Sequence, residues 1–419
     1  MIERTEPTVG PTEPHWVGLD VHKASCTATL IDTQGRAERS WKFPTSPEEL
    51  DRFADGLPTP TSVALEASTV GKAVFRRLAQ RGLEVHMANP RALSVIATAD
   101  VKTDARDSYH LAQLLRPNYL PDSYVPPMDL DEVRQLVRYR MDLGESVAEV
   151  KNKLHALVSR NLFDAFLSDY SDVFGREGLE RLVTLPWPAN DREVLTAYLE
   201  RLQFLLRQAE EAERRLARLA EGNHEVELLM TIPGIGFYAA LGILGEIGEV
   251  RRFPTKKHLY SYAGVVPRAD NSGEKVSLHR HVKRGDSVLK FFLTCAVQGA
   301  LRAKHPNAVA QFYRKKANQL GRPKALVAAT RKMAGVVWGV LTHAAPYAEE
   351  DPRLTVRKTE DLALKARRPL PPPTSPEELQ TLVVELGSKR ELLDRLLEDP
   401  KREIALDDAV NGEEGGFEK

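Results

Sequence analysis

Over the first 125 residues, short apolar runs alternate with helical patterns. The run HWVGLDVHKASCTATLID, which begins at His15, is rich in β-branched and aromatic residues and predicts a long strand or a hairpin. Further strands are expected in RAERSWKFP, TSVALEAS and EVHMANP. Helices are expected in VGKAVFRRLAQRG, closed by Gly82, and in residues 103–115, with Thr103 or Asp104 as N-cap. This order predicts an α/β domain over residues 15–125, with a mixed sheet and helices on its faces.

From residue 126 onward the apolar spacing becomes helical. Residues Val147, Val150, Leu154 and Leu157 keep heptad spacing, and a looser stripe runs from Leu195 to Leu219. Such stripes form either the core between two helices or an oligomerisation seam. They predict a helical coiled-coil arm over residues 126–230, interrupted near LVTLPWPAND, followed by a mainly helical domain over 231–347. Residues 1–14 are expected to be disordered, and residues 348–419 to form a flexible tail with an amphipathic helix.

The composition is that of an ordinary soluble protein, with 42% hydrophobic and 28% charged residues in a chain of 419. The N-terminus has no apolar segment typical of a signal peptide, and no run approaches the ~18 apolar residues that span a bilayer. Cys26 and Cys295 offer neither a disulfide framework nor zinc-ligand spacing. We therefore expect a cytoplasmic protein.

The net charge of zero hides a strong asymmetry. Between Arg251 and Lys332 there are nineteen Lys and Arg against three acids, a net charge of +16, whereas the chain from Glu350 onward carries −5. A solvated basic face would normally include interspersed acids. The segregation therefore predicts a polyanionic partner, and nucleic acid is favoured because Lys and Arg neutralise its phosphates.

Four acidic residues form a candidate metal site. Asp20 interrupts the apolar run WVGLDVH, and Glu66 ends the run SVALE, where ligands collect in open α/β sheets. Asp104 and Asp107 stand at an expected first helical turn and project about 60° apart. Taken singly, each acid has an ordinary explanation, such as a helix cap, a favourable charge at a helix start or a loop. If the four converge, they suit Mg²⁺ or Mn²⁺, and two ions about 4 Å apart would clamp a phosphoryl transfer.

The basic region contains two further motifs. In PGIG, Gly234 and Gly236 separate two helical patterns, and the turn is either a plain interhelical connection or a helix-hairpin-helix-like phosphate contact. The tripeptide Asn271-Ser272-Gly273 predicts a hairpin turn with an exposed serine. Cations that surround it are candidates for nucleic-acid binding: Arg268, Lys275, Arg280, Lys283 and Arg284. Candidate proton acceptors for the serine hydroxyl are Asp270, His279 and His281, and the acids of the first domain could activate it instead if the two domains meet.

Taken together, GLDVHK, ALEAS and KTDARDS resemble the RuvC-like half of the DEDD insertion-sequence transposases of the IS110 family, also called bridge-RNA-guided recombinases. PGIG, AGVVPR, NSG and KRGD are similar to the second domain of that family, so the resemblance runs from about His15 to Tyr347. It implies an RNase H-like fold, divalent metal held by the acids Asp20, Glu66, Asp104 and Asp107, and a serine, here Ser272, that attacks DNA to form a phosphoserine link. Ser277 lies nearby as a second choice.

The resemblance also implies partners. These are donor and target DNA, a structured guide RNA, and a dimer or tetramer in which acids from one subunit meet the serine of another. We predict a Mg²⁺-dependent DNA transposase of the bacterial or archaeal cytoplasm, associated with the nucleoid. Three alternatives remain. They are a RuvC-like junction endonuclease in which water attacks, a non-enzymatic nucleic-acid scaffold, and an actin-like phosphotransferase, which would need a second glycine-rich phosphate loop that the sequence lacks.

Overall fold

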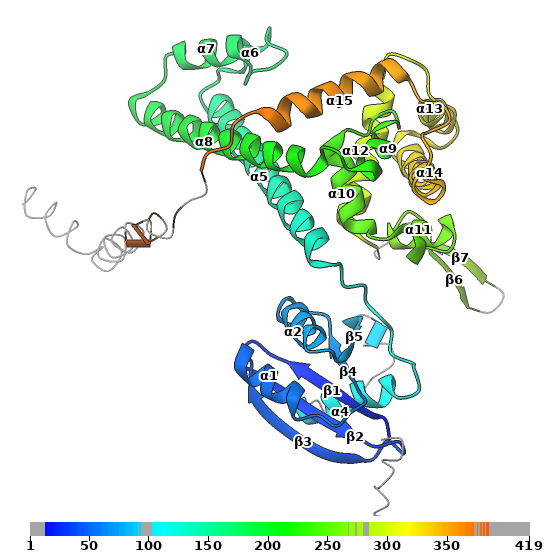
Figure 1. The fold of residues 1–419 in the computed structure, drawn as a ribbon. Coiled ribbons are helices and arrows are strands. Elements are labelled where there is room, and N and C mark those ends of the chain that lie inside the picture. The colour runs from blue at the N-terminus through cyan, green and yellow to red at the C-terminus, as the bar shows by residue number, and fades with distance from the viewer. Residues whose placement is uncertain are drawn as a thin grey trace, which may run out of the picture. The chain divides into compact units, whose positions relative to one another are not determined.

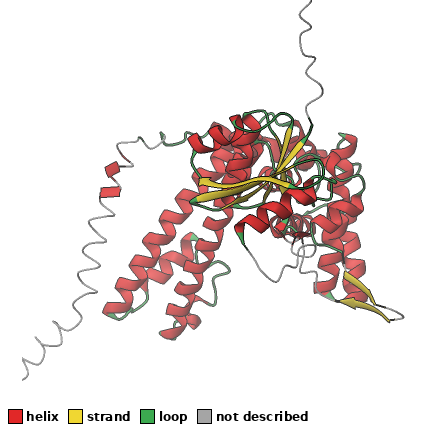
Figure 2. Cartoon of the chain, turned by 90° about the horizontal axis from the view of Figure 1, so that it is seen from below, coloured by secondary structure: helices red, strands yellow, loops and turns green. Residues whose placement is uncertain are grey.

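The structure, a computed structural model, describes residues 13–90, 92–93, 103–266, 268–272, 275–279 and 285–372, and six single positions in 375–384; within 268–272 and 275–279 it describes the backbone alone. The chain divides into two compact units, Met1–Asp131 and Glu132–Lys419. Unit 1 holds a β-sheet, and unit 2 is almost entirely helical (Figures 1 and 2).

A five-stranded mixed sheet forms the centre of unit 1, with strand order β3-β2-β1-β4-β5. The strands are β1 (His15–Val21), β2 (Ser25–Ile31), β3 (Ala37–Pro44), β4 (Thr61–Glu66) and β5 (Glu84–Ala88). The first three are antiparallel neighbours, whereas β4 pairs parallel with both β1 and β5. The run from His15 is therefore a hairpin rather than one long strand, and the predicted mixed sheet is confirmed.

Helices cover both faces of this sheet. One face packs against α1 (Pro47–Asp55) and α2 (Thr69–Gln80), and the other against α4 (Asp104–Leu115). Side chains alternate along β1, so Val17 and Leu19 are buried toward α1 and α2, whereas Gly18 faces α4. This alternation decides which side chains of β1 point toward α4.

Sequence analysis did not identify α1, although its start carries a recognisable signal. Ser46 is the N-cap and accepts a hydrogen bond from the backbone N–H of Glu49, while Pro47 occupies the first helical turn. Helices commonly start with a serine at the cap, a proline directly after it and a glutamate three residues after the cap. Leu50 and Phe53 then bury the apolar side of α1 against the sheet.

Unit 2 contains the predicted helical arm. Its long helices are α5 (Met128–Arg160) and α8 (Ala189–Ala220), connected through α6 (Asp164–Leu167) and α7 (Arg176–Thr184). The heptad residues Val150 and Leu154 of α5 lie in one buried cluster with Leu195 and Leu202 of α8. The stripes are therefore buried between helices of the same chain, the first of the two roles that the sequence left open.

The remaining helices of unit 2 surround one large apolar core. They are α9 (His224–Met230), α10 (Phe237–Ile247), the 3-10 turn η1 (Val250–Arg252), α11 (Lys256–Tyr262), α12 (Ser287–Arg302), α13 (Ala308–Leu320), α14 (Arg322–His343) and α15 (Pro352–Arg367), with the hairpin β6 (Arg268–Ser272) and β7 (Lys275–His279). Among the described helices, α14 alone is long and apolar enough to cross a membrane. Eight of its residues are buried, as in a core helix of a globular unit.

Residues 352–367 lie in the stretch for which the sequence predicted a flexible tail with an amphipathic helix, and they form the helix α15. Leu362 and Ala366 are buried in the core of unit 2. The Lys358 ammonium donates hydrogen bonds to the backbone carbonyls of Met230 (2.6 Å) and Ile232 (2.8 Å). Flexibility is wrong for residues 352–367, because Leu362 and Ala366 pack into the core where α8 and α9 contact α15, although Val356 and Leu364 stay exposed.

Candidate active site

Asp20 and Glu66 end two neighbouring parallel strands. The ladder between β1 and β4 pairs Gly18 with Ala64 and Leu19 with Leu65, so Asp20 and Glu66 occupy the next level. Registered residues of parallel strands share a face, and Gly18 faces α4, so both acids project from the sheet on the α4 side. The structure therefore places them at the carboxyl edge of the strands, as the sequence predicted for Glu66.

The start of α4 supplies the other two acids. Thr103 caps the helix by accepting a hydrogen bond from the backbone N–H of Arg106 (3.3 Å), and Asp104 and Asp107 occupy the first turn. The helix lies unusually close to β1, because a Cβ atom placed on Gly18 would sit 1.7 Å from the carbonyl oxygen of Ser108. A hydrogen bond between the hydroxyls of Thr29 on β2 and Ser108 (2.7 Å) holds α4 against the neighbouring strand.

This packing brings two of the predicted acids together with a histidine. Ligand atoms of Asp20, His22 and Asp104 all lie within 4.8 Å of one another. The Nε2 atom of His22 is 3.1 Å from Asp20 Oδ2 and 3.6 Å from Asp104 Oδ1. The carboxylates of Glu66 and Asp107 lie on the same side but outside this group.

His22 and Lys42 belong to the site, although the sequence analysis did not select them. The Lys42 ammonium lies 3.3 Å from Asp104 Oδ2, reached from β3 across the sheet. His22 stands two positions after Asp20 in the motif GLDVHK, so its position was a usable signal. Lys42 had no such signal, because only the pairing of β3 with β2 brings it near α4.

The electrostatics of the cluster show excess negative charge. Burial raises the pKa of the Asp20 carboxyl, His22 opposes this shift, and the charges of Asp104 and Asp107 raise the pKa further. The hydrogen bond from Lys42, reinforced by its charge and by His22, lowers the pKa of Asp104. The charge of Asp107 is therefore close enough to act on the Asp20 carboxyl. A bound cation would offset the negative charge of these carboxylates.

The PGIG glycines have different surroundings. Gly234 has φ of +91° and packs against α12, since a Cβ there would lie 2.1 Å from the carbonyl oxygen of Ala296. Gly236 is the N-cap of α10, and a Cβ at this position would meet no atom within 4 Å. Helix packing therefore explains Gly234 without a ligand, whereas Gly236 leaves open space at a helix N-terminus.

The serine motif falls at the limit of the described chain. The backbone of β6 ends at Ser272, which pairs with Lys275 of β7, and Ser277 pairs with Asp270, so the predicted hairpin is present. The side chains of these residues, and those of Arg268 and His279, lie outside the described structure. Four predicted residues, Arg280, His281, Lys283 and Arg284, lie outside the described residues altogether.

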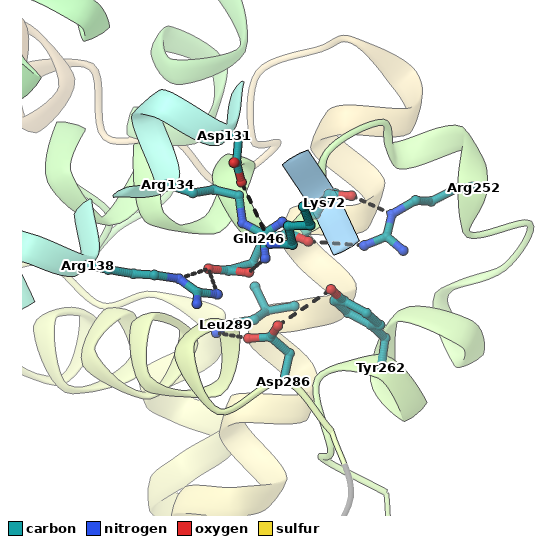
Figure 3. Close-up of polar contacts among 10 residues, drawn as sticks. Lys72, Asp131, Arg134, Arg138, Glu246, Arg252, Tyr262, Asp286 and Leu289 are labelled. Carbon is teal, nitrogen blue, oxygen red and sulfur yellow. Dashed lines mark hydrogen bonds and ion pairs between the residues drawn. The ribbon is translucent and has the colours of Figure 1, made fainter. Parts of the chain in front are cut away.

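A buried ionic cluster joins α5, α10 and η1 (Figure 3). Glu246 on α10 is 2% exposed and accepts hydrogen bonds from Arg134 (2.5 Å) and Arg138 (2.8 Å) of α5. Arg252 donates to the backbone carbonyls of Glu246 and Ile247 and stacks on the Tyr262 ring at 4.4 Å.

Asp286, which follows the hairpin, continues this cluster. Its carboxylate lies 3.5 Å from the Tyr262 hydroxyl and caps α12 at the N–H of Leu289 (2.8 Å). Its backbone N–H donates to the Tyr262 carbonyl at 2.7 Å. Burial raises the pKa of Tyr262, and the charge of Asp286 adds to the shift. The cluster thus holds the point at which the chain returns from the hairpin to α12.

Comparison with known proteins gives matches for both units. A DEDD transposase family model matches residues 17–161, and the model of the transposase IS116/IS110/IS902 family matches residues 226–314. The transposase for insertion sequence element IS1111A of Coxiella burnetii is 24% identical over 68% of this chain and 79% of the relative. The transposase for IS1328 of Yersinia enterocolitica is 25% identical over 80% of this chain and 98% of the relative. The pilin gene-inverting protein of Moraxella bovis is 33% identical over 30% of this chain and 40% of its own length.

These matches, with the acids gathered at the edge of a mixed sheet, define a transposase of an insertion sequence, an enzyme that transfers DNA. The chain belongs to the IS110 family of DEDD transposases. DNA is therefore a partner of this protein.

Proposed function

We propose that this transposase cuts and rejoins DNA through metal-bound acids at Asp20, Glu66, Asp104 and Asp107 and a covalent link to Ser272. The observation that carries the proposal is the convergence of Asp20, His22 and Asp104 within 4.8 Å. The mixed sheet, with acids at the carboxyl ends of neighbouring parallel strands, supports the RNase H-like assignment.

The residues present fit a divalent cation. Asp20 and Asp104 supply oxygen ligands, with His22 beside them and Glu66 and Asp107 on the same side. The raised pKa of Asp20 reflects burial and negative charge that the nearby cations do not fully offset. Oxygen ligands suit Mg²⁺ or Mn²⁺, one or two of which would stabilise negative charge on phosphate oxygens. The close approach at Gly18 keeps α4 on β1, the hydrogen bond between Ser108 and Thr29 keeps it on β2, and together they hold Asp104 beside Asp20.

The proposed transfer step balances as follows. The Ser272 hydroxyl oxygen forms a bond to a DNA phosphorus atom while the bond from phosphorus to a deoxyribose oxygen breaks. The hydroxyl proton passes to a base, for which Asp270, His279 and His281 are the candidates, and the leaving oxygen gains a proton. Attack by the freed oxygen on the phosphoserine would rejoin DNA and release the serine. The acids lie in unit 1 and the serine in unit 2. We propose, from the resemblance to the family, that acids of one subunit act with the serine of another.

A structured guide RNA and a dimer or tetramer complete the proposal. Both rest on membership of the family, and the basic segment around the hairpin supports nucleic-acid binding. RNA extracted from protein purified with its element should contain one discrete, non-coding species from the element's end. Absence of such a species would reject guidance but would leave the cutting chemistry intact.

A covalent-adduct assay tests the chemistry. The full-length protein is incubated with Mg²⁺ and a labelled DNA that carries its element's junction, and protein attached to one strand is measured after denaturation. We expect an adduct from the native protein and from Ser277→Ala, and none from Ser272→Ala or Asp104→Asn. Undiminished adduct from Ser272→Ala would reject the serine. Nicked DNA with free ends and no adduct in any variant would identify a hydrolytic endonuclease instead.

A further inference from the structure

A surface on the helical hairpin α13–α14 has a charge distribution unlike the rest of unit 2. From Ser287 to Ala348 the chain contains ten Lys and Arg and no Asp or Glu. Six of these cations form what we call the α13–α14 basic surface: Arg314, Lys315, Lys316, Arg322, Lys324 and Lys332. The two helices lie side by side (Figure 1).

On the arm of unit 2, several helical cations have acidic partners. Arg140 lies 2.6 Å from Glu213, and Lys153 lies 2.6 Å from Glu149. Within the described chain, no cation of the α13–α14 basic surface forms an ion pair. Unneutralised like charges in one place repel one another, so intramolecular stability does not explain them.

Cations of the two helices converge on one aromatic ring. The ammonium nitrogen of Lys316 on α13 lies 6.0 Å from the centre of the Phe312 ring, and that of Lys332 on α14 lies 5.2 Å from it. Phe312 is itself partly buried against the core of unit 2. Both ammonium groups therefore lie within about 6 Å of one ring that is itself partly buried, so the ring is not an open platform for stacking bases.

The start of α14 adds cations where the helix itself disfavours them. Arg322 and Lys324 occupy the first turn, are exposed, and have no acid beside them in that turn. The positive end of the helix dipole makes this position unfavourable for cations and favourable for anions. The turn becomes favourable once an anionic group binds there.

We propose that the α13–α14 basic surface binds the phosphate backbone of duplex DNA without reading its sequence. From Arg322 to Lys332 the helix rises about 15 Å. That length equals about four base-pair steps along the axis of a duplex. The partly buried Phe312 ring, with an ammonium group from each helix beside it, favours a duplex over a single strand. Most of this surface lies beyond residue 314, where the matched family region ends. The inference rests on the proposed function only in taking DNA as the anion.

The salt dependence of binding tests this surface. Full-length Arg322→Gln/Lys324→Gln protein is compared with Lys153→Gln/Arg176→Gln, which removes the same charge from cations that have acidic partners on the arm. Binding to a duplex of arbitrary sequence is measured without divalent metal over a series of salt concentrations. We expect the slope of log affinity against log salt to fall in magnitude by about 2 in the first variant. The control should keep the native slope. The Arg322→Gln/Lys324→Gln protein should melt at the native temperature or slightly above it, because two cations leave the positive end of a helix dipole.

Equal slopes for the two variants would overturn the proposal, as would a change seen only with single-stranded DNA or with structured RNA. The measurement needs no strand cleavage. It can therefore succeed if the serine mechanism fails, and it can fail while Ser272 still forms its adduct. The two proposals are thus separable.

Discussion

The contact of α4 with β1 is the part of the structure on which the acidic site depends most. In Gly18→Ala, the added methyl group would lie 1.7 Å from the carbonyl oxygen of Ser108 and 2.7 Å from the backbone nitrogen of Ala112. These are backbone atoms of a helix, which no side-chain rotation can remove. Contacts between non-bonded heavy atoms are ordinarily about 3.5 Å long, so α4 must move more than about 1 Å away from β1.

Two consequences follow from this retreat. Overpacking of this kind costs about 1–3 kcal/mol of unfolding free energy, or more where the neighbour is backbone. Asp104 also moves away from Asp20, and a misplacement of about 1 Å in a catalytic group lowers a rate by about 100-fold. We therefore expect Gly18→Ala to lower the melting temperature and to reduce DNA cleavage far more than its loss of stability explains.

The matched control is Gly339→Ala on α14, where an added Cβ would meet no atom within 4 Å. This variant gains helix propensity and should keep native stability or exceed it slightly. Both variants are measured by thermal unfolding and by the covalent-adduct assay at a temperature where each is folded. Native stability and native adduct yield in Gly18→Ala would refute the described packing of α4, and with it the geometry of the site.

Two further predictions concern single carboxylates. Because burial raises the pKa of Asp20, its ionisation costs stability above the unfolded pKa of about 3.9, so Asp20→Asn should raise the melting temperature by a few degrees at pH 7 and not at pH 3. Mg²⁺ should stabilise the native protein but not this variant. Equal stability of the two proteins at pH 7 would contradict a destabilising effect of the ionised Asp20 carboxylate. Glu246→Gln removes the charge of a carboxylate that is 2% exposed and accepts hydrogen bonds from two arginines, so it should lower the free energy of unfolding by about 3 kcal/mol. The control Glu193→Gln, at an exposed position, should lower it by less than about 0.5 kcal/mol. Both values are measured by urea titration. A cost for Glu246→Gln no larger than that of the control would show that the pairs are not formed.

Much of this protein was determined by local sequence. The strands of unit 1 are recognisable because β-branched and apolar runs are local signals, and α4 because Thr103 and the acids of its first turn mark a helix start. The heptad residues of α5 and α8 predicted a pair of helices. The four acids were found by position at strand and helix ends, and the charge of the basic segment was evident from composition alone.

Other features depended on the tertiary structure because they join residues far apart in the chain. Lys42 reaches Asp104 only through strand pairing, and Gly18 matters only because Ser108 lies against it. The two arginine partners of Glu246 lie more than a hundred residues away on α5, and Leu362 and Ala366 of α15 are buried only because α8 and α9 pack against that helix. Periodicity and capping report on neighbours within a turn or two, whereas burial and charge pairing are set by which elements meet.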